Sequence, residues 1–227
     1  MESLDLLANN IANASTGGYK ADREFYSLYT APEAGGNDFL STMPVIEKNY
    51  TDHTQGALQH TGNALDVALH GRGFFAVNGP NGPLYTRNGN FRVSAASQLT
   101  TADGYAVRDT TGAALTVQLG RGVEIAADGT VTQDGNPIGK LEVVDFTSAA
   151  DLTKQGANYF RALDPAAKPG TATGTSVEQG NLEASNTGTA ESAVRLVNVM
   201  RQFEMLQKAV LIGGDMSKKA IEDVAKV

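Results

Sequence analysis

The sequence has 227 residues, enough for one larger domain or two small ones with a buried core. It carries 18 Lys and Arg against 25 Asp and Glu, a net charge of −7, and it has no cysteine. The absence of a basic cluster argues against a nucleic-acid partner, and the absence of cysteine excludes disulfides and thiolate metal sites.

No apolar run reaches the roughly 20 residues that span a bilayer, so we expect no direct membrane insertion. The first residues, MESLDLLANN, lack the basic and apolar regions of a secretory signal. If the protein leaves the cytoplasm, we expect it to use another route.

The N-terminal residues are predicted to form a helix. Its apolar side chains follow the 3-4-3 spacing of a coiled-coil seam at Leu4, Leu7, Ile11 and Ala14. The segment STGGYK should end this helix, with Gly17 or Gly18 available for a left-handed residue.

Three asparagines, Asn9, Asn10 and Asn13, crowd one side of this helix beside the apolar stripe. Asparagine is a poor helix former because its amide competes for backbone groups. One interpretation is that the amides pair at a packed seam and fix its register. The other is that they lie on the solvated flank and Asn13 helps to end the helix. Both remain open from the sequence.

Residues 56–182 have the turn pattern of a β domain. Asn-Gly, Asp-Gly and Gly-Pro turns separate short apolar runs every 8–12 residues, as in TVTQDGNPIGKLEVVDF. This pattern predicts an antiparallel β sandwich or a barrel-like domain. Residues 30–42 and 164–176 are predicted to be flexible loops.

The C-terminal residues predict a longer helix, about 34 Å over residues 190–212. Its seam has the same 3-4 spacing and consists of Leu196, Val199, Phe203, Leu206 and Val210. Gly213 and Gly214 should cost about 2 kcal/mol together inside a helix, so we expect a kink or break there.

The predicted fold is therefore mainly β with α. A central β domain, residues 31–185, is inserted between terminal helices that pair as a coiled coil, residues 1–30 and 186–227. Each helix exposes an apolar stripe that must meet the other helix, another copy of the chain, or both. The predicted assembly interface consists of Leu4, Leu7, Asn9, Asn10, Ile11, Asn13, Leu196, Val199, Phe203, Leu206 and Val210.

A search for catalytic or metal-binding patterns predicts neither an enzyme nor a cofactor. His53, His60 and His70 lack the close spacing of a metal site. The glycines of GRGFF do not continue into a dinucleotide fingerprint. No spacing supports a catalytic acid pair among Asp66, Asp109 and Asp145. The alternative function is a secreted β domain that binds or hydrolyses carbohydrate in a groove lined by Tyr85, Phe91 and Tyr105.

The run from Ala8 to Lys20, ANNIANASTGGYK, resembles the N-terminal signature of the flagellar basal-body rod and hook family. Two further blocks are similar to the family's β core and C-terminal block: GALQHTGNALDVALHGRGFFAV and EQGNLEASNTGTAESAVRLVNVMRQFEMLQKAV. The resemblance covers nearly the whole chain in the right order. Members typically carry a longer segment before the Ala-Asn-Asn motif than the sequence printed here.

The resemblance implies a structural subunit of the flagellar rod. Such subunits leave the cell through the flagellar export apparatus without a cleaved signal peptide. They stack helically with copies of themselves and with other rod and hook subunits, with the terminal helices inside and the β domain outside. The resulting rod crosses the periplasm and transmits torque from motor to hook. The short segment 21–55 resembles a proximal-rod subunit more than a distal one.

Overall fold

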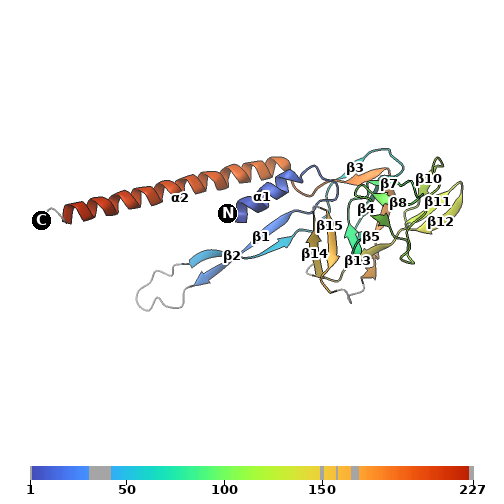
Figure 1. Ribbon diagram of the computed structural model, residues 1–227, viewed down its shortest axis with the longest axis horizontal. Coiled ribbons are helices and arrows are strands. Elements are labelled where there is room, and N and C mark those ends of the chain that lie inside the picture. Colours follow the sequence, from blue (N-terminus) through green and yellow to red (C-terminus); the bar gives the residue numbers. More distant parts are fainter. Residues whose placement is uncertain (1, 31–41, 149–150, 157, 165–168, 225–227) are drawn as a thin grey trace.

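The computed structural model describes residues 2–30, 42–148, 151–156, 158–164 and 169–224. The chain is elongated, because two helices and a long hairpin project from one side of a β-rich domain (Figure 1). The helices are α1 (Glu2–Ala12) and α2 (Thr189–Val224). The hairpin consists of β1 (Asp22–Thr30) and β2 (Thr42–Thr51).

The other strands build the β domain, and all described strand pairs are antiparallel. In chain order these strands are β3 (Leu58–His60), β4 (Val67–His70), β5 (Phe74–Gly79), β6 (Gly82–Thr86), β7 (Phe91–Val93), β8 (Leu99–Thr101), β9 (Ala106–Val107), β10 (Val123–Ile125), β11 (Thr130–Gln133), β12 (Asn136–Lys140), β13 (Val143–Asp145), β14 (Leu152–Gln155), β15 (Tyr159–Ala162), β16 (Gly170–Thr171), β17 (Ser176–Gln179) and β18 (Asn181–Glu183).

A nine-stranded sheet runs in the order β14-β15-β6-β5-β9-β8-β7, and β13 joins it beside β5 and carries β16. Strands β10, β11 and β12 form a second sheet, and the pairs β17-β4 and β18-β3 form two small ones. The predicted mainly β fold with antiparallel strands and a C-terminal helix is confirmed, and the sheets are open. Closure into a sandwich or barrel stays a prediction.

The nine-stranded sheet has an apolar core on each face, because neighbouring residues of a strand point to opposite sides. Phe75 of β5 lies in the larger core, which extends to the strands of the other sheets. Phe74, its neighbour, lies in a smaller aromatic core with Tyr85, Phe146 and Phe160. The GRGFF segment therefore supplies one phenylalanine to each core and has no nucleotide-binding geometry.

The predicted Asp-Gly hairpin turn is confirmed at Asp134-Gly135, between β11 and β12. Both residues have positive φ, 49° and 77°, as the tight turn of a two-residue hairpin requires. Gly18 likewise adopts a left-handed conformation with φ 67°, although α1 already ends at Ala12.

The predicted break at Gly213-Gly214 is wrong, because α2 continues unbroken for 36 residues, about 54 Å. A helical glycine costs about 1 kcal/mol relative to alanine but keeps its backbone N–H, so the hydrogen-bond ladder passes through it.

The sequence patterns also gave no indication of the β1–β2 hairpin. Of the two predicted loops, residues 31–41 and 165–168 lie outside the described residues. The described end of the second loop contains β16 and the first residue of β17.

Candidate assembly interface

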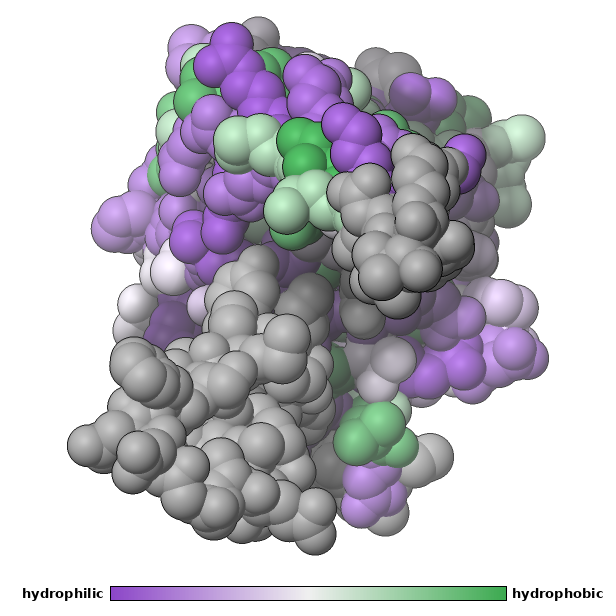
Figure 2. Space-filling model, turned by 90° about the vertical axis from the view of Figure 1, so that its left-hand side faces the viewer, coloured by the Kyte–Doolittle hydropathy of each residue, from purple (hydrophilic) through white to green (hydrophobic). Residues whose placement is uncertain are grey.

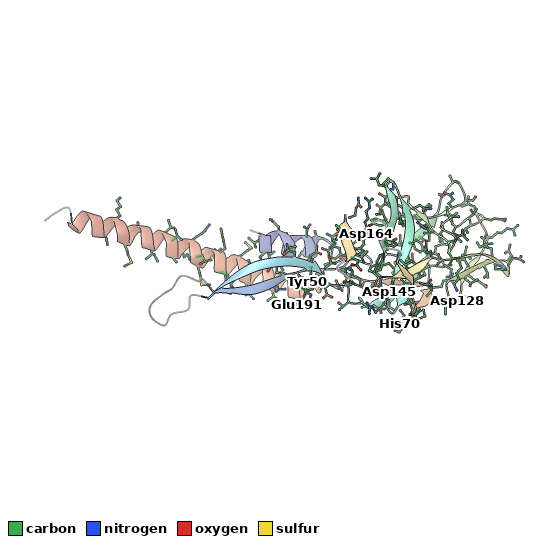
Figure 3. All side chains as sticks on the ribbon, turned by 90° about the horizontal axis from the view of Figure 1, so that it is seen from below. Tyr50, His70, Asp128, Asp145, Asp164 and Glu191 are labelled. Carbon is green, nitrogen blue, oxygen red and sulfur yellow. The ribbon has the colours of Figure 1, made fainter. Side chains whose placement is uncertain are left out.

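The C-terminal half of α2 projects from the molecule with no other described element beside it, as Figures 1 and 3 show from two directions at right angles. The predicted seam residues from the middle of α2 onward are correspondingly open to solvent. Phe203 is 43% exposed, Leu206 65% and Val210 74%. Figure 2 faces the C-terminal end of α2 and shows hydrophobic residues at the surface between hydrophilic ones.

The N-terminal part of α2 is covered by α1, which lies beside it and beside β1. Leu7 of α1 is buried, and Leu4 and Ile11 are half-buried. On α2, Leu196 and Val199 are half-buried as well. The predicted seam residues are therefore partly or fully covered near the β domain, and those beyond Val199 are exposed.

The three asparagines of α1 have different environments. Asn10 is buried, and its amide oxygen accepts hydrogen bonds from the Tyr19 hydroxyl and the Asp22 backbone N–H, both at 3.0 Å. Its Nδ2 donates to the Asp22 carbonyl at 2.8 Å. Asn10 therefore fixes the end of α1 against the start of β1 within the same chain.

Asn13 ends the helix, because its Nδ2 donates to the Asn9 carbonyl at 2.9 Å and its Oδ1 accepts from the Thr16 hydroxyl at 3.3 Å. Asn9 is exposed, at the edge of a hollow that Tyr19 and Lys154 also line. Among the three, Asn9 is the residue whose side chain is free to face solvent or a neighbouring subunit.

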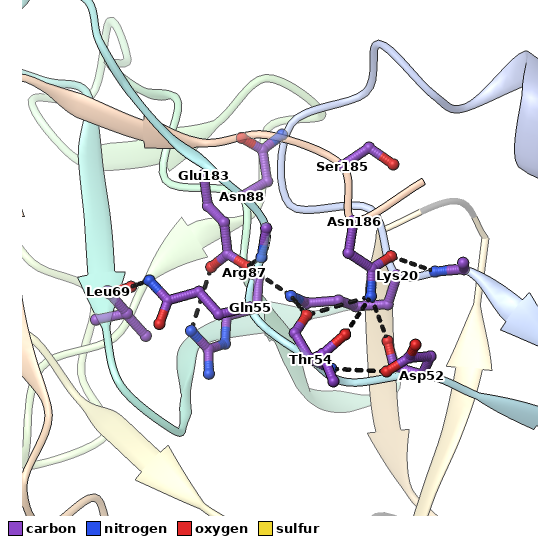
Figure 4. Close-up of polar contacts among 12 residues, drawn as sticks. Lys20, Asp52, Thr54, Gln55, Leu69, Arg87, Asn88, Glu183, Ser185 and Asn186 are labelled. Carbon is purple, nitrogen blue, oxygen red and sulfur yellow. Dashed lines mark hydrogen bonds and ion pairs between the residues drawn. The ribbon is translucent and has the colours of Figure 1, made fainter. Parts of the chain in front are cut away.

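Where the helices and hairpin meet the β domain, three charged side chains are buried together. We call Lys20, Arg87 and Glu183 the junction cluster (Figure 4). Lys20 Nζ lies 2.5 Å from Glu183 Oε1, and Arg87 Nη1 lies 3.2 Å from Glu183 Oε2. Lys20 comes from the N-terminal motif and Glu183 from the C-terminal block, so the cluster joins the two ends of the chain.

Burial sets the electrostatics of this junction. It lowers the pKa of the Lys20 ammonium, and the attraction of Glu183 opposes that shift. Burial, with a contribution from Asp22, raises the pKa of the Tyr19 hydroxyl to about 12. His53, beside the cluster, has its pKa lowered to about 4 by burial and by the cations Lys20 and Arg87.

The predicted aromatic groove is wrong. Tyr85 and Phe91 are 4% and 1% exposed because each fills an apolar core, and Tyr105 packs edge-on against Tyr159. A sugar cannot stack on rings that the protein's own core covers, so the carbohydrate alternative loses its site.

Three aspartates were considered as members of a catalytic acid pair, and each of them has hydrogen-bond donors of its own. Asp66 accepts from Asn90 Nδ2, and Asp109 accepts from the Thr111 hydroxyl. Asp145 accepts from the backbone N–H of the residue that follows it. In the part of the chain that the structure describes, no group of three or more His, Cys, Asp and Glu is placed to hold a metal ion. Neither described helix is apolar enough over a sufficient length to cross a membrane.

Arg87 and Glu183 of the junction cluster were not predicted from the sequence, and neither was the neighbouring Asn186, whose Oδ1 accepts a hydrogen bond from the Ala21 backbone N–H. Glu183 and Asn186 lie in the segment NLEASN, where a single acid between short apolar and polar residues has no periodicity. The available signal was their position inside a block that resembles the rod and hook family.

Comparison with known proteins places the chain among flagellar proteins. Residues 68–133 match the flagellar hook protein FlgE/F/G D1 domain, and residues 178–223 match the C-terminal region of flagellar basal body rod FlgEFG proteins.

The curated relatives cover nearly the whole chain. The flagellar basal-body rod protein FlgF of Caulobacter vibrioides is 31% identical over 99% of this chain and 92% of its own length. FlgF of Rhizobium meliloti is 32% identical over 96% of this chain and 90% of its own length. The rod protein FlgG of Bacillus subtilis is 29% identical over 96% of this chain and 92% of its own length.

Proposed function

Because the chain belongs to the family of flagellar basal-body rod proteins, we propose that it is a structural subunit of the rod and assembles through its terminal helices. Its partners are copies of itself and related rod and hook subunits. It resides in the basal body, transmits torque from motor to hook and catalyses no reaction. It reaches the rod through the flagellar export apparatus.

The observation that supports assembly most strongly is the number of large apolar side chains that α2 exposes. Ten of its large hydrophobic side chains are between 43% and 74% exposed: Val194, Val197, Met200, Phe203, Met205, Leu206, Val210, Leu211, Ile212 and Met216. The β domain buries its own cores, so this exposure is concentrated on one element. Of these ten side chains, Phe203, Leu206, Val210 and Leu211 line one shallow hollow on α2, and an exposed apolar patch of this kind is typical of a protein–protein interface.

The remaining parts of the proposal follow from the same surface. Residues 1–30 and 186–227 form the assembly domain, and residues 31–185 form the outward β domain. The terminal helices pair as a coiled coil within and between subunits through the apolar residues of the predicted interface: Leu4, Leu7, Ile11, Leu196, Val199, Phe203, Leu206 and Val210. Among the asparagines, exposed Asn9 is the one suited to an amide contact between subunits.

Deleting the gene and imaging basal bodies in the mutant cells tests the proposal. We expect basal bodies without a complete rod, and the stage of arrest distinguishes the proximal position, which we favour, from the distal one. Intact rods and normal swimming in the deletion strain would contradict the proposed function.

Complementation with variants locates the interface. Phe203→Asp places a charge in the exposed seam and should abolish rod completion, because a carboxylate buried between packed helices is unpaired. Gln202→Asp adds the same charge to an exposed polar position next to it and should restore swimming. Equal complementation by both variants would show that the seam is not the contact surface.

A further inference from the structure

All three projecting elements of the protein leave the β domain within a few residues of the junction cluster. β1 begins at Asp22, two residues after Lys20, and α2 begins at Thr189, six residues after Glu183. α1 is fixed to the same place because Asn10 contacts Tyr19 and Asp22. The directions of α1, α2 and the hairpin are therefore determined over a short stretch of chain.

Glu183 is the centre of this region, with a side chain that has no solvent exposure. Besides Lys20 and Arg87, its carboxylate accepts a hydrogen bond from the Gly56 backbone N–H at 2.9 Å. Lys20 Nζ also donates to the Thr54 carbonyl at 2.6 Å, and Arg87 Nη2 donates to the Gly71 carbonyl at 2.8 Å. One carboxylate thus joins its own chain segment to three others, those of Lys20, Gly56 and Arg87.

Asn186 continues the same pattern toward α2. Its Oδ1 accepts from the Ala21 backbone N–H at 2.8 Å, and its Nδ2 donates to the Asp52 carbonyl at 2.7 Å. Backbone bonds run in parallel, from Gly18 N to the Glu183 carbonyl at 2.8 Å and from Asn186 N to the Tyr19 carbonyl at 3.3 Å. The start of α2 is therefore tied to the residues that precede β1.

From these contacts we infer that the junction cluster is a positioning device that sets the direction of the terminal helices relative to the β domain. The inference depends on the proposed function only for the reason why this direction matters: in a stack of subunits, a fixed angle between the helices and the β domain is needed for regular packing. The fixed angle itself is a property of the single chain.

The net charge of the junction cluster predicts that a single substitution, Glu183→Gln, disturbs it. It contains two cations and one anion, all buried. Glu183→Gln keeps the shape of the side chain but leaves two uncompensated buried cations, which favours opening of the junction to water. Adding Lys20→Met brings the net charge back to that of the parent, so the double variant should recover part of the order.

Pulsed electron-paramagnetic-resonance distance measurements on the full chain test the inference. Because the sequence has no cysteine, nitroxide labels attach only at introduced positions. We would introduce the labels at Asn198→Cys on α2 and Ala96→Cys in the β domain. Both positions are exposed and lie outside the junction cluster. We expect Glu183→Gln to broaden the distance distribution at least twofold, and Lys20→Met with Glu183→Gln to narrow it again.

Hydrogen exchange on the same variants separates a positioning role from a general loss of stability. In Glu183→Gln, the amides of α1 should exchange at least tenfold faster while those of β5 and β6 keep their rates. The matched control is Asp134→Asn, which removes a carboxylate from the exposed Arg121–Asp134 ion pair and should change neither measurement.

Two results would overturn the inference. One is an unchanged distance distribution and unchanged α1 exchange in Glu183→Gln. The other is a loss of β5 and β6 protection in Glu183→Gln as large as that of α1, because the cluster would then hold the β domain itself together. Neither depends on rod assembly, whereas intact rods in the deletion strain would contradict the proposed function alone.

Discussion

Protonation of His53 should destabilise the protein at mildly acidic pH. Its ring contacts Phe74 and Phe160, with centroids 5.6 and 5.0 Å away, and its buried Nδ1 has no hydrogen-bond partner among the residues that the structure describes. Burial opposes a positive charge on the ring most strongly, Lys20 and Arg87 oppose it next, and Asp52 favours it less strongly than either cation opposes it. The folded protein therefore holds His53 neutral.

The sign and size follow from proton linkage. The pKa of His53 is about 4 in the folded chain against an ordinary value of 6.5, so the unfolded state binds more protons between these values and stability falls as pH falls. From pH 7 to pH 5 the full shift corresponds to about 2 kcal/mol. Because the ring is partly accessible to solvent, we expect about 1 kcal/mol.

Urea unfolding at pH 7, 6 and 5, followed by circular dichroism, measures this loss. His53→Phe keeps an aromatic ring in place and removes the titration, so its stability should vary less with pH than that of the parent. His70→Gln, a change at an exposed histidine, is the control and should retain the parental pH dependence.

The pH range is chosen to separate His53 from the carboxylates. Asp52, Asp109 and Asp128 have pKa values below 3.8, so the stability they contribute is present above that value and is lost only below the range measured. If His53→Phe lost as much stability as the parent between pH 7 and pH 5, the reasoning would be refuted.

Gly18→Ala should destabilise the chain by more than about 2 kcal/mol in urea unfolding, because its φ is 67° and a Cβ would collide with neighbouring backbone. Gly104→Ala, with positive φ but open space, should cost about 1 kcal/mol, and equal losses would contradict the steric argument. Asn10→Ala leaves buried partners unpaired and should cost about 2 kcal/mol, with faster hydrogen exchange in α1; unchanged exchange would contradict its docking role. Replacing Gly213 and Gly214 by alanine should stabilise α2 by about 1 kcal/mol each with little change in the helical circular dichroism signal, and a marked rise of that signal would contradict a helix that is already continuous.

Local patterns predicted those parts of the fold that depend on neighbours in the sequence. The Asp134-Gly135 turn forms as expected because its backbone conformation is accessible to few residue types. The apolar periodicity of α2 likewise predicts a helix, since a 3-4 repeat places the repeated apolar side chains on one side of a helix. The continuation through Gly213 and Gly214 was not predicted, because glycine propensity is a small cost that a long ladder of hydrogen bonds can absorb.

The junction cluster could not be predicted in the same way, because its members are distant in sequence. Lys20 and Glu183 are 163 residues apart, and which lysine meets which acid depends on the finished topology. The sequence also left open what the asparagines of α1 do. The structure answers this for two of them: Asn10 docks the helix and Asn13 ends it.

The motif that identifies the family and the face proposed for assembly are therefore different parts of the molecule. Within the motif, Asn10, Tyr19 and Lys20 are buried in contacts inside the chain, whereas Phe203 and Leu206 of α2 face solvent. A substitution in the buried set changes how the helices are held, and a substitution in the exposed set changes what they can bind. Similarity in the motif thus indicates how a single chain is built, whereas the assembly that we propose is to be tested on the exposed side chains of α2.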